Sequence, residues 1–190
     1  MTDPYALFAR WFEEARAAGE PMPEAVALAT STPEGRPSVR YVLYRGHGPD
    51  GFRFFTSYQS RKGDELAANP HAALAWHWPT LTRQVRVEGA VSRLSAADSD
   101  AYFASRPRGS QLAAWASPQS QPLAYPALEA RYAELEDTYR DRPVPRPPHW
   151  GGFLIAPTRI EFWEGREYRL HRRRLYVPSP QGWQESELAP

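Results

Sequence analysis

The stretch that decides the fold is Arg83-Gln84-Val85-Arg86-Val87-Glu88-Gly89-Ala90-Val91-Ser92-Arg93-Leu94. Small or apolar residues recur at every second position from Val85 to Val91, which places them on one face of an extended chain. We therefore predict a long β-strand with one buried face. Residues 71–78 are predicted to form a second strand that pairs with it.

Further β-type runs lie on both sides of this pair. Residues 25–30, 38–45 and 52–56 are separated by turn residues and predict two consecutive hairpins. Later strands are expected at residues 152–156, 159–163, 168–176 and around Trp183. Helices are expected at residues 4–18, 60–69, 95–105, 108–116 and 126–139. Short antiparallel strands with helices between them predict an α+β, mainly β, barrel or curved sheet, because parallel βαβ units would need a regular alternation that is absent.

The composition is that of a packed globule. The 190-residue chain is 42% hydrophobic and contains seven Trp, ten Tyr and eight Phe, which suits one domain with a sizeable core. We expect that domain to span residues 1–190. The formal net charge is only +1, which argues against a broad nucleic-acid or acidic-membrane surface, because such surfaces need a large excess of positive charge.

The residue types also narrow the chemistry and the location. The chain has no cysteine, which excludes disulfides, thiolate catalysis and cysteine-based zinc sites. Its five histidines lack the spacing of metal ligands, so no metal site is expected. No apolar run approaches the roughly 20 residues of a membrane-spanning helix, and the N-terminus lacks a secretory pattern. A cytoplasmic location is therefore expected.

A basic stretch near the C-terminus is the first candidate for function. It reads Tyr168-Arg169-Leu170-His171-Arg172-Arg173-Arg174-Leu175-Tyr176. If it is extended, Arg169, His171 and Arg173 share one face, where two cations flank an imidazole. The alternative is a surface strand with solvated charges.

A second candidate is Arg40-Tyr41-Val42-Leu43-Tyr44-Arg45. On a strand, Arg40, Val42 and Tyr44 share one face, and Tyr41, Leu43 and Arg45 share the other. Two cations in a mostly apolar strand are costly to bury unless they meet an anion. The alternative is that both arginines reach solvent at the strand ends.

A strand end that runs into a helix N-terminus predicts an anion site. The sequence is Phe55-Thr56-Ser57-Tyr58-Gln59-Ser60-Arg61-Lys62, and Lys62 is the one lysine of the chain. Free backbone N–H groups, hydroxyls and two cations can together bind a phosphate. An ordinary helix start is the alternative.

A second anion site is predicted after the long strand. Tyr102 and Arg106 lie four residues apart on an expected helix and so project together, and Ser110 follows the helix break at Arg106-Pro107. Helix capping is the alternative role for Ser110. Gln84 could offer a donor and an acceptor to the edge of a heteroaromatic ring. Two anion sites with hydrogen-bonding amides suggest two phosphorylated aromatic compounds held against each other.

Several motifs together resemble those of the pyridoxamine 5'-phosphate oxidase family. The resemblance covers nearly the whole chain and rests on Asp3-Pro4, Leu7-Phe8-Ala9-Arg10-Trp11, Arg83-Gln84-Val85, Ser105-Arg106-Pro107-Arg108, Trp150-Gly151-Gly152-Phe153, Glu161-Phe162-Trp163 and Arg169-Leu170-His171. It implies a homodimer of FMN-binding split β-barrels, built from Greek-key antiparallel strands with peripheral helices and with FMN at the subunit interface.

The resemblance also implies roles for individual residues. FMN would be bound from one subunit by Arg40, Tyr41, Val42, Leu43, Tyr44, Arg45, Phe55, Thr56, Arg61, Lys62 and Gln84. It would be bound from the other subunit by Gln119, Ser120, Trp163 and Arg173. The substrate would be held by Arg45, Tyr102, Arg106, Ser110, Arg169 and His171, and Arg169 and His171 would be catalytic. Arg45 stands where the family usually has a lysine, which keeps the charge but changes the hydrogen-bond geometry.

The implied reaction is oxidation of pyridoxamine or pyridoxine 5'-phosphate to pyridoxal 5'-phosphate, with O2 as acceptor and H2O2 as product. Two alternatives remain open. One is a flavin oxidase of the same fold that acts on another aromatic substrate, such as a phenazine precursor. The other is a non-catalytic protein that binds flavin or pyridoxal phosphate.

Overall fold

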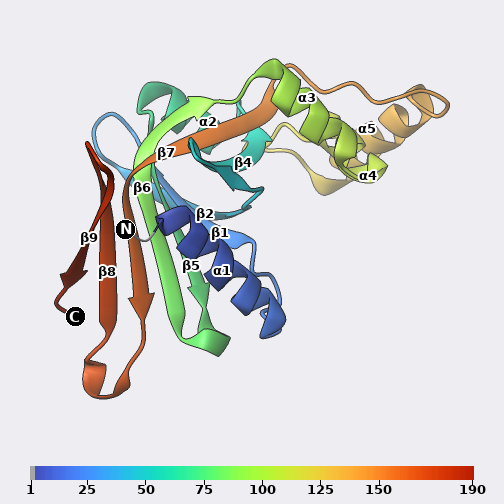
Figure 1. Ribbon diagram of the computed structural model, residues 1–190. Helices are drawn as coiled ribbons and strands as arrows, with labels where there is room; N and C mark the ends of the chain where they lie inside the picture. The colour runs from blue at the N-terminus through green and yellow to red at the C-terminus, as the bar shows by residue number, and fades with distance from the viewer. Residues whose placement is uncertain (1–2) are drawn as a thin grey trace.

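The computed structural model describes residues 3–190, and within that range nine strands form one antiparallel sheet flanked by five α-helices (Figure 1). The helices are α1 (Pro4–Ala17), α2 (Arg61–Ala68), α3 (Ala96–Ser105), α4 (Arg108–Ala116) and α5 (Tyr125–Thr138), with short 3-10 turns η1 (Pro79–Leu81) and η2 (Glu167–Arg169). The strands are β1 (Ala25–Ser31), β2 (Pro37–Leu43), β3 (His47–Gly48), β4 (Gly51–Ser57), β5 (His71–Trp78), β6 (Arg83–Arg93), β7 (Trp150–Glu164), β8 (Arg172–Ser179) and β9 (Gly182–Leu188). The predicted α+β, mainly β, class is confirmed.

Strand β7 organises the sheet. One of its edges pairs with β6 along nearly its whole length. Its other edge is divided, because β4 pairs with the first half and β8 pairs with the second half. The full order is β2-β1-β5-β6-β7-β4-β3, and β8 and β9 branch from β7 (Figure 1). This divided edge is how one sheet forms a split barrel.

The structure corrects one strand prediction. The expected strands at residues 152–156 and 159–163 are a single 15-residue strand, β7. Pro157 lies inside it, where the pairing register with β6 shifts between Glu88 and Gly89. A β-bulge of this kind admits a proline, because the bulge interrupts the hydrogen-bonded ladder. Gly89 suits the crowded bulge, since a Cβ there would lie 2.0 Å from the carbonyl oxygen of Ala156.

The hairpin prediction is half right. Strands β1 and β2 form the expected antiparallel hairpin, with Ala25 opposite Leu43. The second expected hairpin is reduced to β3, where His47 and Gly48 pair with the start of β4. Strand β4 instead pairs with β7 along its length, with Phe55 opposite Gly152. This leaves β2 at the edge of the sheet.

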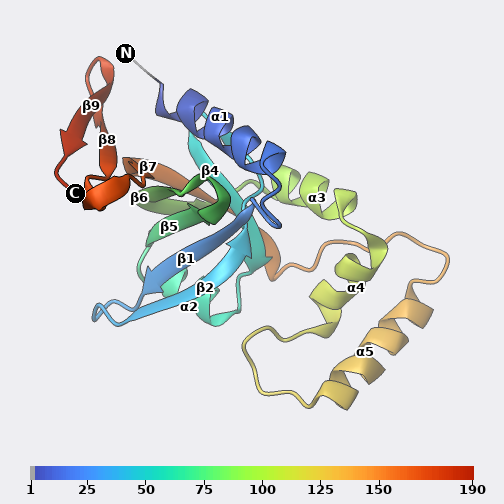
Figure 2. The ribbon, with the colours of Figure 1, turned by 90° about the horizontal axis from the view of Figure 1, so that it is seen from below.

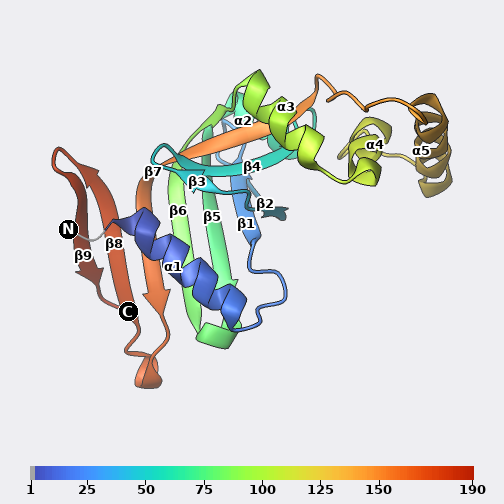
Figure 3. The same cartoon turned by 45° about the vertical axis from the view of Figure 1, so that its right-hand side comes forward.

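Helix α1 closes the main core. Asp3 caps it by accepting a hydrogen bond from the N–H of Tyr5 at 3.0 Å, and Pro4 occupies its first turn. Its apolar face, which includes Phe8 and Trp11, is buried against the barrel. Figure 3 shows the helix lying across the strands. The helix and its cap are as predicted.

Helices α3, α4 and α5 extend away from the barrel as a separate lobe (Figure 2). A second small core, formed by Phe103, Leu112, Val144 and Trp150, holds this lobe to the beginning of β7. Its helices match the predicted ranges to within a residue at most ends. No helix of residues 3–190 combines the length and apolar character that crossing a membrane requires.

The C-terminal basic stretch is not one strand, and this corrects the prediction of a shared face for Arg169, His171 and Arg173. Strand β8 begins at Arg172. The preceding residues form η2, and both Tyr168 (φ 56°) and Arg169 (φ 63°) adopt left-handed backbone conformations. An L-residue pays a steric cost in this conformation. Arg169 therefore lies in a turn, Arg173 lies on β8, and the two side chains do not share one strand face.

Candidate functional site

A cleft of about 900 Å³ lies between the edge strand β2, the beginning of α2 and the lobe of α3 and α4. This cleft contains both predicted anion sites. It is lined by Ser38, Val39, Arg40, Tyr41, Val42, Leu43, Arg45, Phe55, Thr56, Ser57, Arg61, Lys62, Tyr102, Arg106, Pro107, Ser110, Ala113, Ala114, Ser117, Gln119, Ser120 and Trp150.

The first anion site lies where β4 meets α2. Ser60 caps the helix, as predicted, and its hydroxyl accepts a hydrogen bond from the N–H of Gly63 at 3.4 Å. Position 63 requires glycine, because a Cβ there would lie 2.2 Å from the carbonyl oxygen of Tyr58. The close approach of the helix to the strand end brings Lys62 beside Thr56.

Lys62 is buried, and its ammonium donates to three oxygens. These are the hydroxyls of Thr56 at 3.3 Å and Ser60 at 3.1 Å and the amide oxygen of Gln119 at 3.2 Å. The pKa of Lys62 is lowered to about 8, mainly by burial and also by nearby Arg40, while Glu65 opposes the change. A bound anion would favour the charged form of this lysine.

Stacked aromatic rings line part of the cleft. Phe55 and Tyr102 stack with ring centroids 3.9 Å apart, and Trp150 continues the stack 5.8 Å from Phe55. The guanidinium of Arg106 lies over Trp150 at 4.6 Å. These ring contacts hold the side chains of Tyr102 and Arg106 in place at the second anion site.

Arg106 supplies a buried, unpaired donor to the second anion site. Its Nη1 is buried without a hydrogen-bond partner in the part of the chain that the structure describes. Burial lowers the pKa of Arg106, nearby Tyr102 opposes this, and Arg45 adds to it. An unpaired buried cation is costly, and Ser110 lines the same part of the cleft. A phosphate bound there would satisfy this donor.

Tyr44 does not share the cleft with its neighbours on β2. Its ring packs edge-on against Phe8, Phe12 and Trp76, and its hydroxyl hydrogen-bonds Nδ1 of His47 at 2.5 Å. The side chain of Tyr44 therefore belongs to the main core. The other residues predicted from residues 40–45 all line the cleft.

A second group of predicted residues gathers elsewhere, where β6, β7 and β8 lie side by side. Gln84 is opposite Trp163, and Trp163 is opposite Arg173. His171 lies 4.6 Å from Trp163, ring centroid to ring centroid. We call Gln84, Trp163, Arg169, His171 and Arg173 the strand-end cluster. None of the five lines the cleft.

Backbone and side-chain contacts orient the strand-end cluster. The N–H of Arg166 donates to Nδ1 of His171 at 3.2 Å, so the neutral imidazole carries its proton on Nε2. Arg173 donates to the buried carboxylate of Glu161 at 2.8 Å, and this hydrogen bond raises the pKa of Arg173. Arg169 is exposed.

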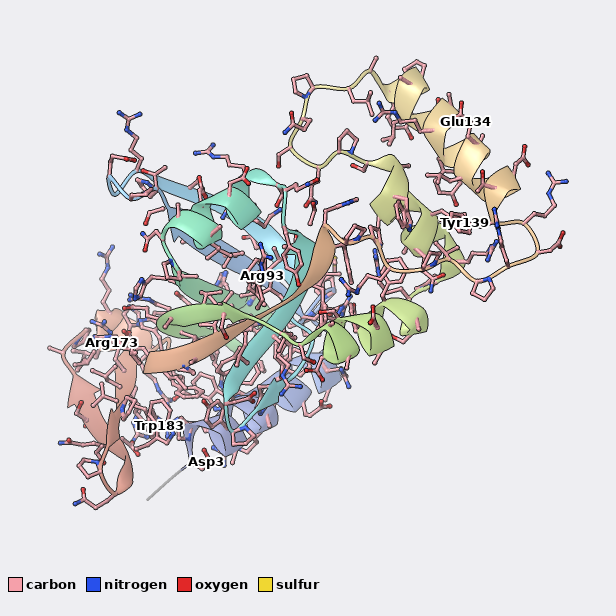
Figure 4. The ribbon with its side chains drawn as sticks, turned by 90° about the horizontal axis from the view of Figure 1, so that it is seen from above. Asp3, Arg93, Glu134, Tyr139, Arg173 and Trp183 are labelled. Atoms are coloured by element: carbon pink, nitrogen blue, oxygen red, sulfur yellow. The ribbon has the colours of Figure 1, made fainter. Side chains whose placement is uncertain are left out.

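The structure regroups the residues that were assigned to two subunits. Gln119 and Ser120 were expected opposite Lys62, on the other subunit, but they line the same cleft as Lys62 in one chain. Gln84 was expected to bind FMN from the same subunit as Lys62; strand register places it opposite Trp163, and it does not line the cleft that contains Lys62. In Figure 4 the labelled Arg173 lies at the end of the molecule opposite the α5 lobe.

Sequence reasoning missed two residues that shape the cleft. Trp150 belongs to the aromatic stack that lines the cleft, although the sequence marked it only as part of a family motif. Glu65 does not line the cleft but binds two residues that do, Arg61 at 2.9 Å and Arg40 at 3.2 Å. Its spacing of four residues from Arg61 on a helix was the available signal.

Family models match this chain in two parts. Residues 12–139 match the model described as pyridoxamine 5'-phosphate oxidase. Residues 150–190 match the pyridoxine 5'-phosphate oxidase C-terminal dimerisation region. The chain belongs to the pyridoxamine 5'-phosphate oxidase family. The suspected resemblance is confirmed, as are the enzyme class and FMN as the cofactor of this family.

Curated relatives agree along almost the full length. The pyridoxine/pyridoxamine 5'-phosphate oxidase of Sphingopyxis alaskensis is 54% identical over 99% of this chain and 88% of its own length. The protein of the same name from Rubrobacter xylanophilus is 56% identical over 99% of this chain and 87% of its own length.

Solved structures confirm the split-barrel fold. PhzG from Burkholderia lata 383, solved with tetrahydrophenazine-1-carboxylic acid, superposes with a TM-score of 0.94 at 32% identity and covers 100% of this chain and 94% of its own. A pyridoxamine 5'-phosphate oxidase-related, FMN binding protein from Nostoc punctiforme reaches a TM-score of 0.81 at 22% identity over 100% of both chains.

Proposed function

We propose that this enzyme oxidises pyridoxamine 5'-phosphate or pyridoxine 5'-phosphate to pyridoxal 5'-phosphate, with O2 as the electron acceptor and H2O2 as a product. For pyridoxine 5'-phosphate the alcohol loses two electrons and two protons, and O2 gains both. For the amine, one water is also consumed and ammonia is released. The observation that carries the proposal is one cleft that contains two anion sites, at Lys62 and at Arg106, and has the stacked rings of Phe55 and Tyr102 in its lining.

The site at Lys62 fits the FMN phosphate. It offers the ammonium of Lys62, the hydroxyl of Thr56 and the exposed guanidinium of Arg61 at a helix N-terminus. FMN, when bound, supplies the two-electron acceptor for the substrate carbon and passes the electrons to O2. The protein contributes binding, orientation and charge around it.

The site at Arg106 fits the substrate phosphate. The unpaired Nη1 of Arg106 and the hydroxyl of Ser110 would donate to it, and Tyr102 would hold its edge of the pocket. Arg45 adds a second cation at this end of the cleft. Each charge-assisted hydrogen bond contributes about 1.5–3 kcal/mol.

A homodimer would bring the strand-end cluster of one subunit to the cleft of the other. The matched dimerisation region covers residues 150–190, which contain Trp163, Arg169, His171 and Arg173. In this arrangement Arg169 would hold the substrate ring and stabilise the charge that develops during the oxidation. His171, fixed through Nδ1, presents Nε2 for orientation or proton movement. The cofactor would lie at the interface, and all 190 residues would act as one domain.

A phenazine-precursor oxidase is the second candidate, because PhzG superposes so well. The Arg106 site can bind a carboxylate as well as a phosphate. The higher identity of the pyridoxine/pyridoxamine 5'-phosphate oxidases, 54% and 56% against 32%, favours the phosphorylated substrate.

Oxygen uptake by the FMN-loaded protein tests the proposal. Pyridoxamine 5'-phosphate, pyridoxine 5'-phosphate and tetrahydrophenazine-1-carboxylic acid are compared under air, and pyridoxal 5'-phosphate is followed by its absorbance. We expect turnover with at least one B6 phosphate and stoichiometric H2O2. Turnover of the phenazine alone would favour the second candidate, and FMN retention without oxygen uptake from any substrate would contradict both.

A further inference from the structure

Glu65 is a buried carboxylate that touches the cleft only through other residues. It lies in the second turn of α2 and is 6% exposed. Its oxygens accept hydrogen bonds from the hydroxyls of Thr30 and Ser38, from Nη2 of Arg40 at 3.2 Å and from Nε of Arg61 at 2.9 Å. One carboxylate therefore ties α2 to both β1 and β2.

The charge of Glu65 is kept despite its burial. Burial by itself raises the pKa of Glu65, but the hydrogen bonds from Ser38, Thr30, Arg61 and Arg40 outweigh it and lower the pKa to about 2. Glu65 is thus ionised throughout the range in which the enzyme can work. Four donors on one carboxylate are more than a simple ion pair needs, and together they fix the position of the Glu65 side chain.

The carboxylate holds the two arginines differently. The two terminal nitrogens of Arg40 are engaged, because they also donate to the carbonyl oxygen of Leu28 at 3.3 Å and to the hydroxyls of Thr30 and Ser38, and its Nε is the donor left for a ligand. Arg61 uses only Nε for Glu65, so its terminal nitrogens remain free to meet a ligand in the cleft. Both side chains line the cleft.

The local charges fit a phosphate monoester. Arg40, Arg61 and Lys62 are three cations around the first anion site, and Glu65 is the one carboxylate among their contacts. The combined charge of these four groups is +2, which matches the nearly dianionic state of a phosphate monoester at neutral pH. Without Glu65, three cations would repel one another before the ligand arrives.

We propose that Glu65 is a positioning residue for the FMN phosphate: it holds Arg40 and Arg61 in the cleft wall so that the anion site is formed before the cofactor binds. The inference rests on the proposed placement of the phosphate at Lys62. Glu65 does not line the cleft and would act only through these arginines.

Glu65→Gln tests this role, because the amide keeps the shape and removes the charge. Asp64→Asn is the matched control: it removes the same charge from the adjacent, exposed position on the same helix. Dissociation constants of the apoprotein for FMN and for riboflavin, which lacks the phosphate, are measured by quenching of flavin fluorescence. We expect Glu65→Gln to weaken FMN binding at least tenfold with little change for riboflavin, and Asp64→Asn to change neither by more than twofold.

A double-mutant cycle separates positioning from general stability. If Glu65 acts through Arg40, then Glu65→Gln added to Arg40→Gln should weaken FMN binding by far less than it does in the wild-type background. Fully additive losses would contradict the proposal. Wild-type FMN affinity in Glu65→Gln would also overturn it while leaving the phosphate site in place.

A second variant and the riboflavin affinity of the wild type settle the remaining outcomes. If Glu65→Gln does not fold, Glu65→Asp is used, which keeps the charge but withdraws it by one methylene. Reduced FMN affinity with unchanged riboflavin affinity then supports the proposal, and unchanged FMN affinity overturns it. If the wild type binds riboflavin as tightly as FMN, the phosphate placement itself is wrong, and the failure belongs to the proposed function.

Discussion

Trp150 and Trp163 lie at the two ends of the same strand and belong to different functional groups. Trp150 lines the cleft, and Trp163 is the centre of the strand-end cluster. The two residues are 13 positions apart on this strand, or roughly 43 Å of chain at about 3.3 Å per residue. The proposed function therefore needs the cleft of one chain and the strand-end cluster of another to meet at one flavin.

Subunit mixing tests this arrangement directly. Lys62→Gln damages the cleft, and Arg169→Ala damages the strand-end cluster. When the two inactive variants are unfolded together and refolded at equal amounts, half of the dimers are mixed and one of their two sites is intact. We expect about one quarter of the wild-type specific activity to return. Each variant refolded alone is the control, and no recovery in the mixture would contradict a shared site.

Arg169→Ala is expected to slow the chemical step and leave the cofactor bound. Removing one group that stabilises developing charge costs on the order of 100-fold in rate. Anaerobic stopped-flow reduction of the bound flavin measures the step, and the visible spectrum reports FMN content. Arg166→Ala is the matched control, because Arg166 is exposed on the same loop and its side chain pairs with Glu164. Loss of FMN from Arg169→Ala would show that Arg169 binds the cofactor and would contradict its assignment to the substrate.

Arg106→Gln is expected to raise KM for the phosphorylated substrate. Loss of one charge-assisted hydrogen bond of about 1.5–3 kcal/mol corresponds to roughly 10- to 150-fold. FMN affinity should stay within twofold of the wild type. Arg131→Gln on the exposed side of α5 serves as the control. An equal loss of FMN and substrate affinity would show that the two anion sites are not separate.

FMN binding is expected to weaken as pH rises above about 8. The pKa of Lys62 in the free protein is about 8, and the phosphate raises it in the complex, because a nearby negative charge favours the ammonium. Below pH 8 both states are protonated and affinity is flat. Above it, binding must also recover a proton, so affinity falls with pH. FMN titrations from pH 6.5 to 9.5 measure this, with Lys62→Gln expected to show a flat profile.

The sequence predicted those features that local chemistry determines. Ser60 caps α2 because a hydroxyl before a helix satisfies free N–H groups in any context. Lys62 lies in the first turn of the same helix. The alternation around Val85 predicted β6 for a similar reason, since one face of that strand is buried along most of its length. These predictions needed no knowledge of distant parts of the chain.

What the sequence did not supply concerns long-range partners. Strand pairing places Gln84 opposite Trp163, and a pairing register cannot be read from either strand alone. Arg169 was placed on a strand, but the chain turns through two left-handed residues there. Glu65 was overlooked because its burial and its hydrogen bonds from Thr30 and Ser38 arise only when α2 packs against β1 and β2.

Helix α5 has no buried residue, although it packs against α4, which lines the cleft. The guanidinium of Arg108, at the start of α4, binds the carbonyl oxygens of Tyr139 and Arg142 just beyond α5. An element with so little apolar area to lose should be the first to open on warming. Heat inactivation would then begin with weaker substrate binding, while FMN is still bound and the solution is still yellow.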